Sequence, residues 1–257
     1  MRKWLQENEI FFKTAAYLLL PAIAIVISMQ ANIIAQRQTE IAEGQSEILR
    51  REKLPIISMT VDKEVDQKAG TYSEDILRIV NDGAPLQDLE IYKGVFFLAE
   101  YGRNGESTQR ALLPVNGYYL FTTTMAQTTG PLRTLFTPQN GLTFHQIQQR
   151  FHDYAEDTGA FGSLTIQRYF EINYRDIFGE EHKAVYYVDP ISGGSELSSG
   201  IRRLAAIQAI KLHREAGLTG LLVDFEDTSP ERILAQFDAF QTIKRQAYPI
   251  LHYLWQT

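Results

Sequence analysis

Residues 14–36 read TAAYLLLPAIAIVISMQANIIAQ, an uncharged run that lies between Lys13 and Arg37. A transmembrane helix needs about 20 apolar residues to cross the hydrocarbon core of a bilayer, so this run is long enough to span one. An amphipathic surface helix of a soluble protein would carry a polar stripe, and the central turns of this run carry none. We therefore expect a short tail over residues 1–13 and a transmembrane helix over residues 14–36.

A cleaved signal peptide is the competing interpretation of the same run. Ala22-Ile23-Ala24 has the small-x-small pattern of a cleavage site after a basic start. Cleavage there would leave IVISM as an apolar new terminus, which favours the anchor. The Lys and Arg residues that flank the run are nearly equal in number on its two sides, so they do not decide the orientation.

A heptad pattern follows the apolar run over residues 37–53, where QTEIAEG is followed by QSEILRR. Isoleucine recurs every seven residues and glutamine occupies the facing core position. Isoleucine at such positions favours three or four strands over a parallel dimer, and a polar core residue fixes the register. A single amphipathic helix is the alternative, because three heptads are marginal for a coiled coil. The predicted oligomerisation residues are Ile34, Gln38, Ile41, Gln45 and Ile48.

Residues 54–191 alternate between apolar and polar side chains, which predicts short β-strands. Arg168 is the one charge on the apolar face of the clearest strand, and Gly94 is expected to mark a bulge or a strand break in another. Asp176–Glu180 is expected to turn the chain into a hairpin. The strands are expected near residues 57–61, 73–80, 86–101, 164–174 and 183–188. Together they predict an antiparallel β-sandwich-like domain.

Helices are expected within and after this domain. The capping-box pattern Thr143-Phe144-His145-Gln146 predicts an inserted helix over residues 143–157. Residues 196–257 read as helix, short strand and helix, with Pro230 at the first position of the last helix. They form an expected α/β subdomain behind a flexible joint at residues 192–195, or pack back on the sheet. The expected fold class is a membrane-anchored α+β protein: a transmembrane helix, a short coiled-coil helix, an antiparallel sandwich and C-terminal helices.

Two further stretches carry a resemblance, namely IVNDGAPLQDLEI (Ile79–Ile91) and INYRDIFGEEHKAVYYV (Ile172–Val188). With the anchor and the QxEI heptads, they make the chain similar to a loose group of uncharacterised bacterial single-pass membrane proteins with an immunoglobulin-like β domain. Some members resemble membrane effectors of anti-phage defence. The resemblance implies a location in the bacterial inner membrane. It assigns the β domain to the cytoplasm, while the flanking charges leave the side of the membrane undecided. It transfers no catalytic residue.

The chain offers few residues for catalysis. It has no cysteine, and it lacks the common phosphate-loop, zinc-protease and serine-hydrolase motifs. Asp224, Glu226 and Asp227 form an acidic cluster that could hold Mg²⁺, or that only favours the amino end of the next helix. We expect no enzyme, no cofactor and no bound metal. The alternative is a membrane-tethered metal-dependent hydrolase that uses this cluster.

The expected function is that of a self-associating inner-membrane protein presenting a β-rich sensor, interaction or effector domain. Its expected partners are the lipid bilayer, further copies of the chain and another protein. The chain carries 25 Lys and Arg against 31 Asp and Glu, a formal charge of −6, and nucleic-acid binding needs the opposite balance. A periplasmic domain for envelope binding or assembly is a further alternative.

Overall fold

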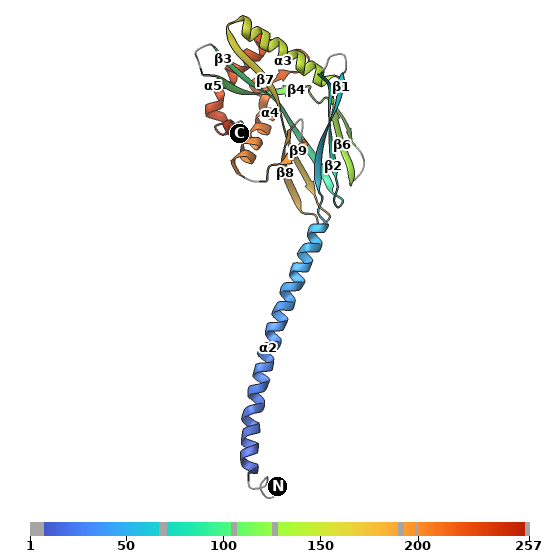
Figure 1. Ribbon diagram of the computed structural model, residues 1–257, viewed down its shortest axis with the longest axis vertical. Coiled ribbons are helices and arrows are strands. Elements are labelled where there is room, and N and C mark those ends of the chain that lie inside the picture. The colour runs from blue at the N-terminus through green and yellow to red at the C-terminus, as the bar shows by residue number, and fades with distance from the viewer. Residues whose placement is uncertain are drawn as a thin grey trace. The chain divides into compact units, whose positions relative to one another are not determined.

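The computed structural model describes residues 8–66, 71–103, 107–124, 128–189, 193–198 and 200–254. The chain divides into two compact units, Met1–Lys53 and Leu54–Thr257. Helix α2 (Glu9–Glu52) forms the described part of the first unit, and ten strands with three further α-helices form the described part of the second (Figure 1). The division falls just before Pro55, where the chain leaves the helical conformation.

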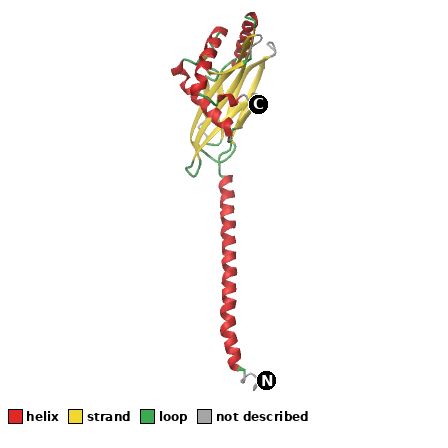
Figure 2. Cartoon of the chain, turned by 90° about the vertical axis from the view of Figure 1, so that its left-hand side faces the viewer, coloured by secondary structure: helices red, strands yellow, loops and turns green. Residues whose placement is uncertain are grey.

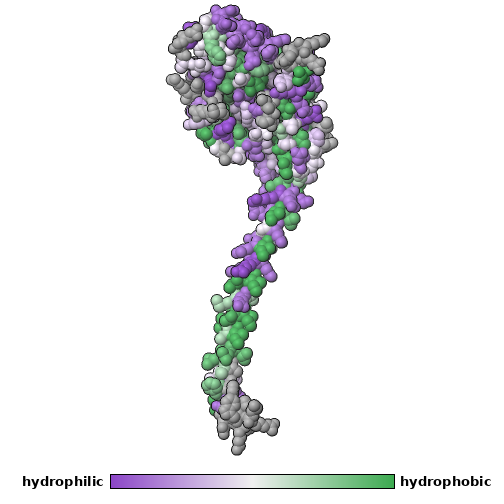
Figure 3. Space-filling view, in the orientation of Figure 1, coloured by the Kyte–Doolittle hydropathy of each residue, from purple (hydrophilic) through white to green (hydrophobic). Residues whose placement is uncertain are grey.

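Helix α2 is continuous over 44 residues, so the expected transmembrane segment and heptad segment are parts of one helix. It includes Pro21 without a break. By length and composition it can cross a membrane, and no residue of its most apolar window is buried among those described. Figure 3 shows hydrophobic residues crowded along its N-terminal half and hydrophilic ones interspersed farther along.

The second unit contains two sheets, as the alternating pattern predicts. The first has the strand order β1-β2-β6-β5 and the second has the order β10-β4-β3-β7-β8-β9. All pairs are antiparallel except β10 with β4, which is parallel. The strands are β1 (Ile57–Asp66), β2 (Thr71–Asn81), β3 (Gln87–Arg103), β4 (Gln109–Asn116), β5 (Phe121–Thr124), β6 (Gly130–Phe136), β7 (Ala160–Arg175), β8 (Glu181–Asp189), β9 (Gly193–Glu196) and β10 (Val223–Asp224).

Helices pack against strands of both sheets. Helix α3 (Asn140–Asp157) packs on β2 and β7, whereas α4 (Gly200–Thr219) crosses β3, β4, β7 and β8. Helix α5 (Pro230–Ala247) runs beside β4 and β10, and the 3₁₀ helix Leu251–Leu254 packs on α4. Figure 2 shows most of the helical segments of this unit on one side of the strands. The described residues between 196 and 254 thus pack back on the sheet and add β10 to its edge.

The central part of strand β7, residues 168–172, is buried on both faces, because alternate side chains meet different partners. Arg168 points to Asp75 of β2, and Glu171 pairs with Arg214 of α4. The adjacent aromatic residues of β3 also point to opposite faces of the sheet. Phe96 packs edge-on against His213 of α4, and Phe97 stacks on Phe144 of α3. The rings of Phe96 and Phe97 are therefore each covered by a helix.

The glycines at residues 193–194 were expected to form a flexible joint, and that expectation is wrong. They begin β9, which pairs with β8, and they let β1 approach closely. A Cβ on Gly194 would lie 2.5 Å from the Cβ of Met59. Gly193 and Gly194 are therefore needed for packing, while Ser192 lies outside the described residues.

Two other local expectations are wrong. Gly94 lies in regular register opposite Tyr169, and the irregularity of β3 falls between Gln87 and Glu90. The inserted helix begins at Asn140 instead of near Thr143, whose amide belongs to the first turn and donates to the carbonyl of Gln139. The side chain of Asn140 is used for tertiary bonds, as described below. By contrast, the β7–β8 hairpin and the start of α5 at Pro230 are confirmed.

Asn81, in the stretch that carries the resemblance, is a buried hub at the end of β2. Its Oδ1 accepts hydrogen bonds from the amides of Ile56 and Gly83, both at 3.0 Å. Its Nδ2 donates to the carbonyls of Ala84 and Thr128, at 2.7 and 2.8 Å. One amide group thus satisfies four backbone groups, and it fixes the loop before β3 to the start of β1.

Replacing Asn81 with Ala is expected to destabilise the protein by at least about 2 kcal/mol, because several backbone groups lose their partners together. The measurement is urea unfolding of the full chain in detergent. The control is Asn116→Ala, at an exposed position at the end of β4, which should change stability little. Equal effects of the two substitutions would contradict the hub role of Asn81.

Candidate functional site

The predicted oligomerisation residues lie along α2 as the heptad requires. Ile34, Ile41 and Ile48 have exposed fractions of 56%, 60% and 60%, and Gln38 and Gln45 are exposed as well. Side chains seven residues apart return to nearly the same face of a helix, with a drift of about 20° per heptad. The isoleucines therefore form one apolar line on α2 that is open to a partner.

Asp224 ends β10, and it and Asp227 have local partners. Oδ1 of Asp224 accepts a hydrogen bond from the amide of Glu226 at 3.1 Å. Asp227 is exposed and pairs with Arg232 at 3.1 Å, close to the start of α5. Such contacts are typical of a turn leading into a helix, and they supply no observation in favour of the hydrolase interpretation.

Among the described residues, a different cluster has potential ligand atoms close enough together to hold a metal ion. Potential ligand atoms of Asp176, Glu180 and His182 lie within 4.8 Å of one another at the β7–β8 turn. Both oxygens of Asp176 are already used, because Oδ1 accepts the amides of Phe178 and Glu180 and Oδ2 bonds His182 at 2.8 Å. Burial raises the pKa of Asp176, but these hydrogen bonds outweigh it and leave the pKa low. The carboxylate therefore closes the hairpin.

The most distinctive polar cluster of the second unit is centred on Asp75 and Arg168. Arg168 has an exposed fraction of 1%, and its Nη1 lies 2.7 Å from Oδ2 of Asp75. The hydroxyl of Tyr118 donates to Oδ2 at 2.7 Å, and that of Tyr119 donates to Oδ1 at 3.2 Å. The pair thus joins β2 of one sheet to β7 of the other, with two tyrosines completing the contacts of the carboxylate.

Asn140 and Thr137 hold this cluster in place. Oδ1 of Asn140 accepts the amide of Asp75 at 2.8 Å, and its Nδ2 donates to the carbonyls of Asp75 and Tyr118. Oγ1 of Thr137 accepts the amide of Leu120 at 2.7 Å and donates to the carbonyl of Gly117. Gly117 has φ +94°, a conformation that suits glycine. The segment before α3 therefore positions both tyrosines.

Burial determines the protonation of the cluster. It raises the pKa of Tyr118 and of Tyr119 well above their ordinary value, and the negative charge of Asp75 adds to the effect. For Arg168, burial lowers the pKa, but Tyr119, Tyr118 and Asp75 more than reverse it and raise the pKa. Both hydroxyls therefore remain hydrogen-bond donors at neutral pH, and the guanidinium stays charged.

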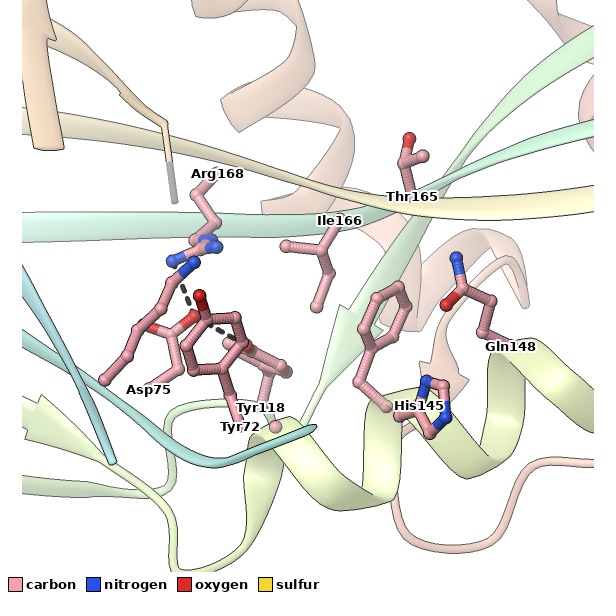
Figure 4. Close-up of a pocket in the computed structure, with 11 residues that line it drawn as sticks. Tyr72, Asp75, Tyr118, His145, Gln148, Thr165, Ile166 and Arg168 are labelled. Atoms are coloured by element: carbon pink, nitrogen blue, oxygen red, sulfur yellow. Dashed lines mark hydrogen bonds and ion pairs between the residues drawn. The ribbon is translucent and has the colours of Figure 1, made fainter. Parts of the chain in front are cut away.

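A cavity of about 310 Å³ adjoins the ion pair, between the two sheets and α3. In Figure 4 the labelled Arg168 reaches from β7 toward Asp75, while His145 and Gln148 rise from α3 on the opposite side. Gln148 donates to the carbonyl of Leu164 at 2.8 Å and so ties α3 to β7. The lining residues are Lys63, Tyr72, Asp75, Tyr118, Gly141, Phe144, His145, Gln148, Thr165, Ile166 and Arg168.

Sequence reasoning singled out Arg168 but did not make it a site residue. Its signal is a charge that interrupts the apolar face of β7, and Asp75 interrupts the buried face of β2 in the same way. Single opposite charges on two apolar faces indicate a pair, since an unpaired buried charge is costly. Which strands face each other is needed to recognise that pair.

No protein-family model matches the sequence, and no curated protein matches it. The functional assignment therefore rests on the residues and geometry of this chain.

Replacing Arg168 with Met is expected to cost about 3–5 kcal/mol of stability, because Asp75 is left as an uncompensated buried charge. The double variant Asp75→Asn/Arg168→Met should recover part of this loss. The exposed pair of Asp62 and Arg78 supplies the control, and Asp62→Asn should cost under about 1 kcal/mol. Urea unfolding of the full chain in detergent measures all three. A loss for Arg168→Met no greater than for the control would show that the buried pair does not join the sheets.

Proposed function

We propose that this chain is a single-pass membrane protein that self-associates through α2 and presents residues 54–257 as a non-enzymatic sensor domain. The observation that carries the proposal is the composition of α2, in which a wholly uncharged stretch continues into a heptad stretch without a break. An apolar helix with its side chains exposed needs a lipid or protein environment. A bilayer supplies the first, and further copies of α2 supply the second.

Self-association is supported by the spacing of the exposed isoleucines. A membrane anchor confines copies of the chain to two dimensions, so that a short heptad segment associates more readily than it would in solution. Gln38 and Gln45 would lie in the core and fix the register of the helices. Gly44 weakens the helix, which suits an association that depends on the anchor.

The sensor role is supported by the cavity beside Asp75 and Arg168, because a pocket with a few converging polar groups is a typical ligand site. The resemblance to membrane effectors of anti-phage defence would place this domain in the cytoplasm, where it would respond to an intracellular ligand. Periplasmic placement would instead favour the envelope-binding alternative.

Membrane insertion is expected to fail when charges enter the apolar part of α2. Lysine near the centre of a membrane-spanning helix costs about 3 kcal/mol per residue, so Leu20→Lys/Val26→Lys should move the chain from the carbonate-resistant membrane pellet to the supernatant. Thr39→Lys/Ser46→Lys, in the heptad part, should leave it in the pellet. A chain of reduced mass after expression, lacking the residues before Ile25, would instead support cleavage of a signal peptide.

The side of the membrane is tested by fusing a fluorescent protein, and separately alkaline phosphatase, to Thr257. Fluorescence without phosphatase activity supports the cytoplasmic sensor. Phosphatase activity without fluorescence supports the envelope alternative and removes the argument from the resemblance.

Self-association is expected to fall when the apolar line of α2 is interrupted. Ile41→Asn/Ile48→Asn should reduce crosslinked oligomers in membranes by about tenfold, because two buried isoleucines per chain are lost from the interface. Glu40→Asn/Glu47→Asn has the same seven-residue spacing on another face of α2 and should leave crosslinking unchanged. Equal crosslinking of the two double variants would exclude this helix face as the interface.

A further inference from the structure

The cavity between the two sheets and α3 contains more positive than negative charge. Lys63 and Arg168 line it, and Asp75 is the single carboxylate among its described lining residues. Lys63 lies directly opposite Asp75 in the β1–β2 ladder, so the two side chains project from the same face of the sheet. The lining therefore has one positive charge in excess.

Asp75 carries one negative charge and can neutralise only one of the two cations. Its Oδ2 is shared by Arg168 and the hydroxyl of Tyr118, and its Oδ1 accepts the hydroxyl of Tyr119. The Nε of Arg168 is buried and has no hydrogen-bond partner among the described residues. A buried donor without a partner costs about 1–3 kcal/mol, so the hydrogen bonds of Arg168 within the described residues do not satisfy its whole guanidinium.

Lys63 is also available to a ligand. Within the part of the chain that the structure describes, its ammonium has one side-chain contact, with the ring of Tyr72, whose centroid lies 4.3 Å from Nζ. An ammonium held over an aromatic ring keeps its hydrogen-bond donors. Lys63 and Arg168 thus provide a point charge and a guanidinium, the two groups that proteins use for carboxylates and phosphates.

The remaining lining is apolar in part. Phe144 of α3 and Ile166 of β7 face the cavity, and Gly141 allows α3 to approach β2, since a Cβ there would lie 2.6 Å from the carbonyl oxygen of Tyr72. An apolar group and an anionic group can therefore be bound together.

We propose that this cavity binds a small organic anion, a carboxylate or phosphate attached to a compact apolar body, with its oxygens between Lys63 and Arg168. The volume of about 310 Å³ matches the lower end of the range for small-ligand pockets, roughly 300–1,000 Å³. Binding at this cavity does not depend on membrane assembly, because every residue involved lies within residues 54–257. Only the use of that binding for sensing rests on the proposed function.

The test is isothermal titration of the full chain in non-ionic detergent with phenyl phosphate and with benzoate, against benzyl alcohol as a neutral relative. At least one anion should bind with one site per chain and at least about tenfold more tightly than benzyl alcohol, because a charge-assisted hydrogen bond is lost in the neutral compound. Absence of binding by both anions at millimolar concentration, or equal binding of benzyl alcohol, would overturn the proposal.

Two variants locate the binding. Lys63→Met should weaken binding of the anion by about tenfold, while Lys211→Met, on α4 and outside the cavity, should not change it. Lys63 has no ion pair among the described residues, so its replacement should leave the melting temperature nearly unchanged. Unchanged affinity in Lys63→Met would overturn the proposed site.

Inorganic phosphate tests the apolar half of the site. It should bind at least about tenfold more weakly than phenyl phosphate, because it buries no ring against Phe144 and Ile166. Equal affinities would overturn the organic part of the proposal. Crosslinking of the same preparations in membranes reports self-association separately, so failure of ligand binding and failure of the membrane assembly are distinguishable.

Discussion

Asp75 and Arg168 form an ion pair buried between the two sheets, and much of residues 54–257 is arranged around it. Removing two charges from water is costly, and the cost is offset only when the geometry is good and further hydrogen bonds complete the pair. Tyr118 and Tyr119 supply those bonds. Asn140 in turn holds the backbone of Asp75 and of Tyr118, which fixes where α3 begins. The start of α3, the turn at Gly117 and the adjoining cavity thus follow from one requirement, that a buried charge be matched.

The sequence predicts most of the elements and few of their contacts. The long apolar helix, the alternating strands, the β7–β8 hairpin and the start of α5 at Pro230 depend on neighbours within a few residues, so periodicity and turn residues suffice to predict them. The role of Gly194 depends on Met59, and that of Arg168 depends on Asp75. Both partners are distant in sequence. The pattern around Gly194 therefore suggested a flexible joint, and the pattern around Arg168 showed only a charged residue on an otherwise apolar strand face. The acidic run at Asp224 allowed two interpretations from sequence, a metal site or the approach to a helix, and in the structure Asp224 has a local partner.

The two units use apolar residues in contrasting ways. Residues 54–257 bury them on both sides of the six-stranded sheet, so that even the adjacent Phe96 and Phe97 are enclosed by different helices. Helix α2 exposes them along its length. An exposed apolar surface of this size indicates contact with lipid or protein. The proposed function therefore assigns assembly and attachment to the helix, and recognition to the domain, where polar groups are concentrated.

The pairing of β3 with β7 has a consequence for the order in which the protein forms. Partners in this central ladder are separated by 57 residues from Arg103 to Ala160 and by 88 residues from Gln87 to Arg175. Closing such long loops costs entropy before the contacts compensate, which makes folding slow. During synthesis the ladder cannot be completed until Arg175 has left the ribosome, whereas α2 emerges long before. Under the proposed function, the helix would therefore have time to enter a bilayer while the sheet is still unformed.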